Sequence, residues 1–193
     1  MVDKDQALSR TVPSMAKSVV TGAIGFGLVS LCVFATVAYG ERWMYRNLGL
    51  LVAYLTWTVM FIVLSAAVFG SLAVVRWRLP KFFLLFGLAF FAYAAGWMVA
   101  YFMLPNTLGE WIGSLVGSVL MAVVFAVGFS SLRSLLKLSA VLFVSNSLGY
   151  FLGSALYASL GTPTGMLLWG VVYGLFFGAG IGAALQLVQQ PQK

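Results

Sequence analysis

Residues 163–187 read PTGMLLWGVVYGLFFGAGIGAALQL, and this stretch contains no charged side chain. A helix needs about 20 predominantly apolar residues to cross the hydrocarbon core of a bilayer, which is roughly 30 Å thick. The stretch is long enough for that. Pro163 also suits the first turn of a helix, where a missing N–H is no loss. The stretch therefore predicts a transmembrane helix.

Five further apolar runs of comparable length precede this one, and short polar segments separate them. Short connections make consecutive helices antiparallel neighbours, so the expected fold is an all-α, six-helix transmembrane bundle in a single domain over residues 1–193. A membrane β-barrel is a poor match, because its strands alternate apolar and polar residues, whereas these runs are apolar on every side. The predicted spans are about 18–39, 48–75, 81–104, 110–129, 135–158 and 163–187, flanked by a polar segment at 1–16 and a polar tail at 188–193.

The composition supports the same interpretation. Hydrophobic residues make up 62% of the chain and charged residues 8%, whereas soluble domains carry roughly 25% charged residues. A chain so poor in charge would expose much apolar surface to water, so we expect the lipid bilayer to be its main partner. The net charge of +7 is scattered between apolar runs rather than gathered into a basic face, so no nucleic-acid partner is expected.

Lysine and arginine are distributed unevenly between the two sides that six spans define. Cytoplasmic loops are enriched in these residues. One side receives nine of them and the other side only Arg42 and Arg46, so we expect both termini on the cytoplasmic side of a cell's inner (cytoplasmic) membrane. The nine are Lys4, Arg10, Lys17, Arg76, Arg78, Lys81, Arg133, Lys137 and Lys193.

Reactive side chains are scarce in this sequence. It has no histidine, which removes the commonest general base and metal ligand, and Cys32 is its only cysteine. No ionisable residue lies in the middle of a predicted span, where a proton-coupled pump or a voltage sensor normally needs one. We therefore expect no enzymatic activity, no catalytic residues, no metal site and no cofactor.

A row of glycines is the most specific feature of the last span. Gly170, Gly174, Gly178 and Gly182 recur at every fourth position, so they line one helix face. Without side chains, this face lets a second helix approach backbone to backbone, the glycine-zipper arrangement that favours association in lipid. The pattern leaves the partner open. It is a helix of the same chain, a second copy or another membrane subunit, or the face lines a permeation path.

Polar and aromatic residues gather at the middle depth of several spans. Asn146 is central in the fifth span, and an amide in hydrocarbon is costly without a partner, so it should point into the bundle. Tyr150 lies one turn further along the same face, and aromatic residues of other spans lie at similar depths. These residues predict a ligand pocket or, alternatively, interhelical hydrogen bonds alone. The candidate ligand-binding residues are Asn146, Tyr150, Tyr93, Tyr173, Trp97 and Trp169.

Four charged residues lie on the side opposite the basic cluster: Glu41, Arg42, Arg46 and Glu110. Their positions at the predicted ends of the first and fourth spans favour an ion pair between Glu110 and Arg42 or Arg46 across the loops. The alternative is an entrance that selects solutes by charge.

Two functions fit these patterns. The first is a small integral membrane protein that binds or transports a neutral or weakly polar small molecule through a mid-membrane pocket of aromatic and amide groups. The second is a non-catalytic, structural subunit of a larger membrane complex, packed through the glycine face of the sixth helix. Lipid handling is a third class that the sequence leaves open.

Overall fold

The computed structural model describes residues 12–73 and 79–190. Within them all regular structure is helical, and six helices are long and apolar enough to cross a membrane. The prediction of six spans is thereby confirmed by length and composition. The helices are α1 (Met15–Asn47), α2 (Leu50–Gly70), α3 (Leu79–Met103), α4 (Thr107–Gly128), α5 (Leu135–Leu160) and α6 (Thr164–Gln189), with a short 3-10 helix, η1 (Leu132–Ser134), before α5.

Helix α1 differs most from its predicted bounds. It has 33 residues and continues to Asn47, whereas the predicted span stops near Tyr39. The predicted bounds are those of a membrane span, and the helix continues beyond them through Glu41 and Arg42. Glutamate and arginine are good helix formers outside hydrocarbon. The helix ends just before Gly49, whose φ of 82° lies in the left-handed region that glycine adopts without strain.

The other helix ends follow local signals. Asn106, which the sequence places at a break between two spans, accepts hydrogen bonds from the backbone N–H groups of Leu108 and Gly109 and so caps α4. Helix α2 ends at Gly70, earlier than the predicted limit near residue 75. The last two residues of that predicted span, 74 and 75, lie outside the described residues. The same is true of the basic residues Lys4, Arg10, Arg76, Arg78 and Lys193.

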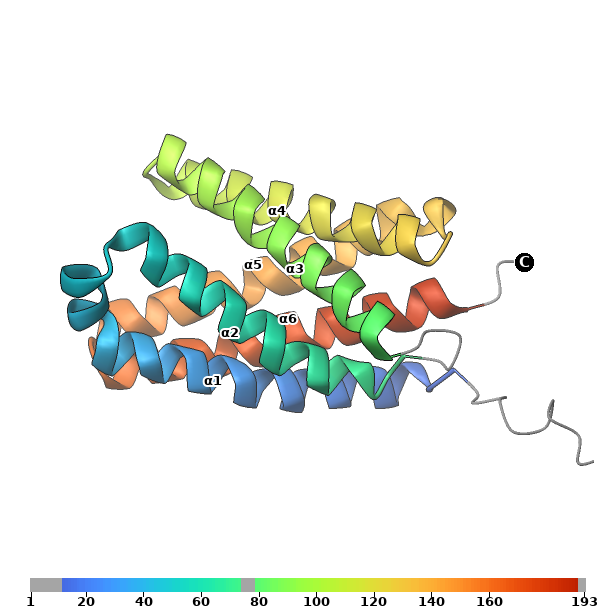
Figure 1. Cartoon of the computed structure of the whole chain (residues 1–193), viewed down its shortest axis with the longest axis horizontal. Helices are drawn as coiled ribbons and strands as arrows, with labels where there is room; N and C mark the ends of the chain where they lie inside the picture. The colour runs from blue at the N-terminus through green and yellow to red at the C-terminus, as the bar shows by residue number, and fades with distance from the viewer. Residues whose placement is uncertain (1–11, 74–78, 191–193) are drawn as a thin grey trace, which may run out of the picture.

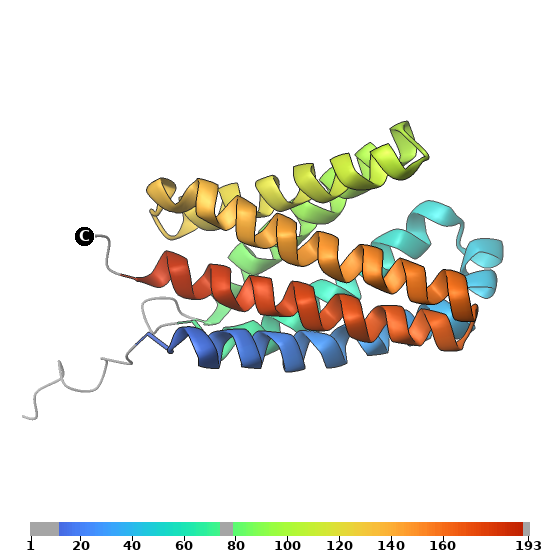
Figure 2. The ribbon, with the colours of Figure 1, turned by 180° about the vertical axis from the view of Figure 1, so that it is seen from behind.

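The six helices close into a ring in chain order. Each helix packs against the next one, and α6 packs against both α5 and α1. Figure 2 shows α1, α6 and α5 side by side. Helix α1 begins and α6 ends at one end of the bundle (Figure 1), which we call the terminal end; the α1–α2, α3–α4 and α5–α6 connections lie at the opposite end, which we call the far end.

The glycine row of α6 faces α1. A Cβ atom built on Gly174 would lie 2.7 Å from the Gly27 Cα, and one built on Gly170 would lie 2.6 Å from the Phe34 Cβ. Cβ atoms on Gly178 and Gly182 would collide with the backbone oxygens of Gly22 and Ser18. The two backbones are therefore too close for any side chain, and the partner of the row within this structure is α1.

Phenylalanine fills the half of the bundle nearer the terminal end. Phe26, Phe69, Phe86, Phe90 and Phe177 are all buried. Their rings form a continuous series of contacts. Between ring centroids, Phe69 lies 5.3 Å from Phe86 and 6.0 Å from Phe26, and Phe26 lies 5.9 Å from Phe177. These are ordinary separations for packed aromatic pairs. Side chains of α1, α2, α3 and α6 contribute this aromatic core, and the buried polar residues Ser65 and Gln186 lie in the same half of the bundle.

Candidate functional site

A cavity of about 200 Å³ lies on the far side of the phenylalanine core. A cavity of roughly 150 Å³ is enough to hold benzene, so this one has room for a small organic molecule. Its walls come from α1, α2, α3, α5 and α6. The lining residues are Val33, Phe34, Val37, Tyr54, Trp57, Thr58, Phe61, Phe90, Tyr93, Ala94, Trp97, Met98, Tyr150, Trp169 and Tyr173.

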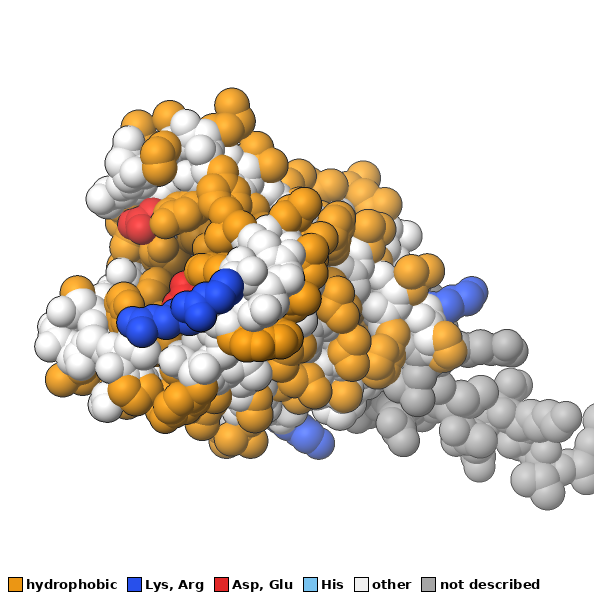
Figure 3. Space-filling view, turned by 60° about the vertical axis from the view of Figure 1, so that its left-hand side comes forward, with side chains coloured by type: hydrophobic (Ala, Val, Ile, Leu, Met, Phe, Trp, Pro, Cys, Tyr) orange, Lys and Arg blue, Asp and Glu red, His pale blue; other side chains and the backbone are white. Residues whose placement is uncertain are grey.

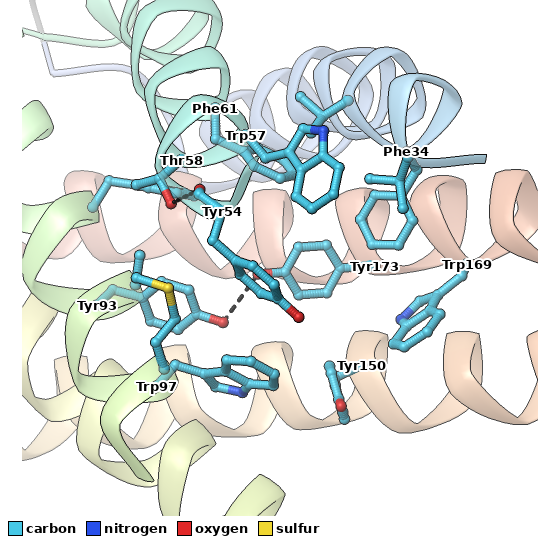
Figure 4. Close-up of a pocket in the computed structure, with 15 residues that line it drawn as sticks. Phe34, Tyr54, Trp57, Thr58, Phe61, Tyr93, Trp97, Tyr150, Trp169 and Tyr173 are labelled. Carbon is cyan, nitrogen blue, oxygen red and sulfur yellow. Dashed lines mark hydrogen bonds between the residues drawn. The ribbon is translucent and has the colours of Figure 1, made fainter. Parts of the chain in front are cut away.

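Aromatic side chains dominate the wall and leave a space between them. Figure 4 shows Tyr54, Tyr173, Trp97, Trp169 and Phe34 arranged around this space. The surface at the far end is hollowed as well: Figure 3 shows hydrophobic side chains in a depression, with acidic and basic side chains at its edge.

Ring contacts fix the orientation of the tryptophans in the wall. Trp97 stacks on Tyr101 with ring centroids 4.9 Å apart. Trp169 packs between Tyr150 and Phe34 at 5.4 and 5.6 Å. Because each indole is held by neighbouring rings, it does not turn freely to seek a hydrogen-bond partner, and the wall is preorganised.

The indole N–H groups of Trp57, Trp97 and Trp169 are buried and have no hydrogen-bond partner. All three belong to residues that line the cavity. A buried tryptophan N–H usually finds a partner, and leaving one unsatisfied costs about 1–3 kcal/mol. These nitrogen atoms have almost no accessible surface, so they lie within the aromatic packing of the wall and are not open to the cavity.

A chain of hydrogen bonds runs from the cavity into the bundle. The Tyr173 and Tyr93 hydroxyls lie 3.0 Å apart, and the Tyr93 hydroxyl donates to Asn146 Oδ1 at 2.6 Å. Asn146 Nδ2 donates to Ser114 Oγ at 2.7 Å, and Ser114 Oγ lies 2.7 Å from Ser147 Oγ. The five side chains are buried and connect α6, α3, α5 and α4.

The structure divides the predicted pocket residues into two groups. Tyr93, Tyr150, Tyr173, Trp97 and Trp169 line the cavity. Asn146 does not; it stands behind Tyr93 and holds it by the hydrogen bond described above. A ligand pocket and a set of interhelical hydrogen bonds are therefore compatible interpretations of these residues, since Tyr93 and Tyr173 belong both to the cavity wall and to the interhelical network.

Sequence reasoning missed several wall residues, of which Trp57 and Tyr54 are the most informative. Trp57 sits deeper in its span than an interfacial anchor should, and that depth was the available signal. Tyr54 has no distinguishing neighbour in the sequence. It reaches the wall because its ring packs against Trp57 and Phe102, at 5.7 and 5.6 Å between centroids.

The predicted ion pair of Glu110 is wrong. Glu110 accepts a hydrogen bond from the Tyr150 hydroxyl at 3.1 Å. Within the described residues, Glu110 makes no ion pair with Arg42 or Arg46. The arginines are exposed and Glu110 is only half-buried. Water competes well with such a contact, and an exposed pair gains about 0–1 kcal/mol at most.

The glycine face of α6 is occupied inside the chain by α1. Another subunit or a second copy would have to displace α1 to use Gly170, Gly174, Gly178 or Gly182. The alternative of a complex subunit packed through this face therefore finds the face covered by α1 in this structure.

Comparison with protein-family models, with curated protein sequences and with solved structures finds no match to this chain.

Proposed function

We propose that this chain is a small integral membrane protein that binds, and in a second step translocates, a neutral or weakly polar solute in the aromatic cavity. The observation that carries the proposal is a cavity of about 200 Å³ whose wall consists mostly of aromatic side chains. The aromatic faces supply apolar contact area for a small molecule.

The proposed neutrality of the solute follows from the lining. No lysine, arginine, aspartate or glutamate is among the residues that line the cavity. An ion placed there would lose its hydration without gaining a counter-ion, which costs far more than the desolvation of a hydroxyl or a carbonyl. Glu110, which contacts the wall residue Tyr150, accepts a hydrogen bond from its hydroxyl.

The proposed orientation puts the cavity in the outer half of the membrane. Lys17, Lys81, Arg133 and Lys137 lie at the terminal end, and Arg42 and Arg46 lie at the far end. By the positive-inside rule the terminal end is cytoplasmic. The site would then load from outside, in the cytoplasmic membrane of a cell. The phenylalanine core separates it from the cytoplasm.

Native mass spectrometry of the full chain, purified in mild detergent, tests the proposal. We expect the wild-type protein to retain small molecules that the triple variant Trp57→Phe, Trp97→Phe, Trp169→Phe loses. Trp43→Phe with Trp111→Phe is the matched control, because both of these tryptophans are exposed. The proposal is wrong if wild type and triple variant carry the same molecules in the same amounts. Any co-purifying subunit would appear in the same spectra.

A further inference from the structure

The wall of the cavity exposes almost no polar surface to the space it surrounds, although many of its residues carry a polar group. The Thr58 hydroxyl donates a hydrogen bond to the backbone oxygen of Tyr54 in its own helix at 2.8 Å. The Tyr54 hydroxyl shares a hydrogen bond with Tyr45, and the Tyr150 hydroxyl donates to Glu110 at 3.1 Å. These hydroxyl groups therefore have partners within the protein.

The remaining polar groups of the wall are enclosed in the protein. The Tyr93 and Tyr173 hydroxyls lie 3.0 Å apart and bond to each other, and Tyr93 also bonds to Asn146 at 2.6 Å. Both tyrosines are buried. The three indole nitrogen atoms of the wall have almost no accessible surface. A molecule in the cavity would therefore meet mainly the carbon atoms of aromatic rings and aliphatic side chains.

Water gains little in such a space. A buried water typically makes about three hydrogen bonds to polar groups that lack another partner. The described residues of this wall provide almost no polar surface for such bonds, so we expect the cavity to be dry. A dry apolar cavity of roughly 150 Å³ binds benzene. This one, at about 200 Å³, has room for a ring with a small substituent.

The floor of the cavity limits the length of a ligand. Phe61 and Phe90 line the cavity on the side of the phenylalanine core, and their rings stack with centroids 5.5 Å apart. Phe26 stacks on Phe61, also at 5.5 Å. An extended acyl chain would have to displace these rings to pass further, whereas a compact ring compound would not. The aromatic wall also favours a ring, because offset and edge-to-face contacts between rings contribute beyond the area that they bury.

We propose that the cavity is a dry binding site for a compact apolar ring compound, of the size of a benzene ring with a small alkyl group. A hydroxyl group on the ligand would lose its hydrogen bonds to water and find almost no partner in the wall. A cation would gain contact with aromatic faces, but it would lose its hydration with no acidic side chain among the wall residues. This inference rests on the proposed function and narrows its neutral or weakly polar solute to the apolar end of that range.

Three small probes separate these chemistries. Toluene and phenol have nearly the same shape and differ in a methyl group against a hydroxyl group. Tetramethylammonium tests whether the aromatic wall takes a cation instead. Equilibrium dialysis of the purified full chain in detergent, with empty micelles of the same detergent as the blank, measures the probe bound per chain in excess of the probe dissolved in micelles.

In wild type we expect saturable binding of toluene and an affinity for phenol that is weaker by about tenfold or more at equal free aqueous concentration, because the phenol hydroxyl loses its hydration. Tetramethylammonium should not bind. Ala94→Leu fills the cavity from α3 and should abolish the binding of toluene. Val37→Phe fills it from α1 and is the second variant, with the same expected result. Ala155→Leu is the matched control and should bind toluene as wild type does, because Ala155 is exposed on α5 and does not line the cavity.

Equal or tighter binding of phenol that Ala94→Leu abolishes would overturn the apolar class of ligand while the cavity stands as the site. Binding of tetramethylammonium with the same sensitivity would overturn it in favour of a cation. If the filling variants bind toluene as wild type does, toluene lies elsewhere and the inference is wrong. If both filling variants fail to give monodisperse protein, the wild-type affinities for the three probes decide. If no probe binds wild type, the inference fails, and retention of solute in the mass spectra judges the proposed function separately.

Discussion

The two halves of the bundle use aromatic residues in opposite ways. Toward the terminal end, Phe69 and Phe86 are fully buried and lie ring against ring with no polar atom between them. Toward the far end, Trp57, Trp97 and Trp169 surround a cavity of about 200 Å³ and leave their N–H groups without partners. One half is filled and the other is left open.

The difference distinguishes a half of the bundle that is stabilised by packing from the half in which we propose a binding site. Phenylalanine in the far half would bury as much apolar surface without an unsatisfied donor. Three tryptophans in its place carry a penalty of about 1–3 kcal/mol each. The indole nitrogen atoms are enclosed in the wall, so this penalty belongs to the packing of the wall and not to an open binding group. The substitutions below test this contrast.

The largest effect should follow from a side chain forced into the contact between α1 and α6. Gly178→Leu places a bulky group against the Gly22 backbone and the Phe26 side chain. Overpacking costs typically 1–3 kcal/mol where neighbours give way, and here the neighbour is backbone. We expect loss of a monodisperse protein in size-exclusion chromatography. Gly40→Leu is the control, since nothing lies within 4 Å of a Cβ at Gly40. Equal behaviour of the two variants would contradict the packing.

Phe86→Ala should destabilise the filled half by about 3–5 kcal/mol, the usual range for such a truncation in a close-packed core. Phe34→Ala should cost less, because Phe34 already borders the cavity and loses fewer contacts. Both values come from the free energy of unfolding in mixed micelles as the fraction of denaturing detergent is raised. A larger loss for Phe34→Ala would remove the distinction between the halves.

Ser114→Ala should have an intermediate effect. Ser114 bonds to both Asn146 and Ser147, and an interhelical hydrogen bond in a membrane protein is worth about 0.6 kcal/mol on average. We expect a loss of roughly 1 kcal/mol in the same unfolding assay. Ser118→Ala, which removes a hydroxyl without a partner, should change little. No difference between the two serine variants would mean that the network does not hold the helices together.

Trp169→Phe should change the free energy of unfolding by less than about 1 kcal/mol, because loss of the unsatisfied N–H offsets the lost ring contacts. Bound solute should nevertheless decrease in the mass spectra. Stability and binding would then respond independently in the far half. A destabilisation as large as that of Phe86→Ala would show instead that this indole is part of a filled core.

The smallest effect is expected at the far surface. Glu110→Gln keeps an oxygen that accepts a hydrogen bond from the Tyr150 hydroxyl. The free energy of unfolding should therefore change by less than about 0.5 kcal/mol. Raised salt should not alter the wild-type value either, since Glu110 makes no ion pair with the nearby arginines. If the free energy of unfolding of the wild type depended strongly on salt and that of Glu110→Gln did not, the ion pair expected from the sequence would be supported after all.

The sequence alone determined the six spans. In lipid every backbone N–H and C=O must be paired within the chain, so an apolar run of sufficient length has to be helical. Residues 163–187 are such a run, and they lie almost entirely within α6. Length and polarity are local properties, and they need no knowledge of neighbours. Hydropathy says less about where a helix ends: α1 continues through Glu41 to Asn47, because glutamate and arginine are good helix formers.

The partners of these helices were decided only by the tertiary structure. The glycine row predicted close packing, but it did not say which helix is the neighbour. Only the ring of helices in the structure identifies that neighbour as α1. Asn146 was expected to need a partner, and only the fold chose Tyr93 and Ser114 and turned the amide away from the cavity wall. These choices depend on the rotation and register of each helix against the others. Many small packing contacts across the bundle set them together, and no single segment contains that information.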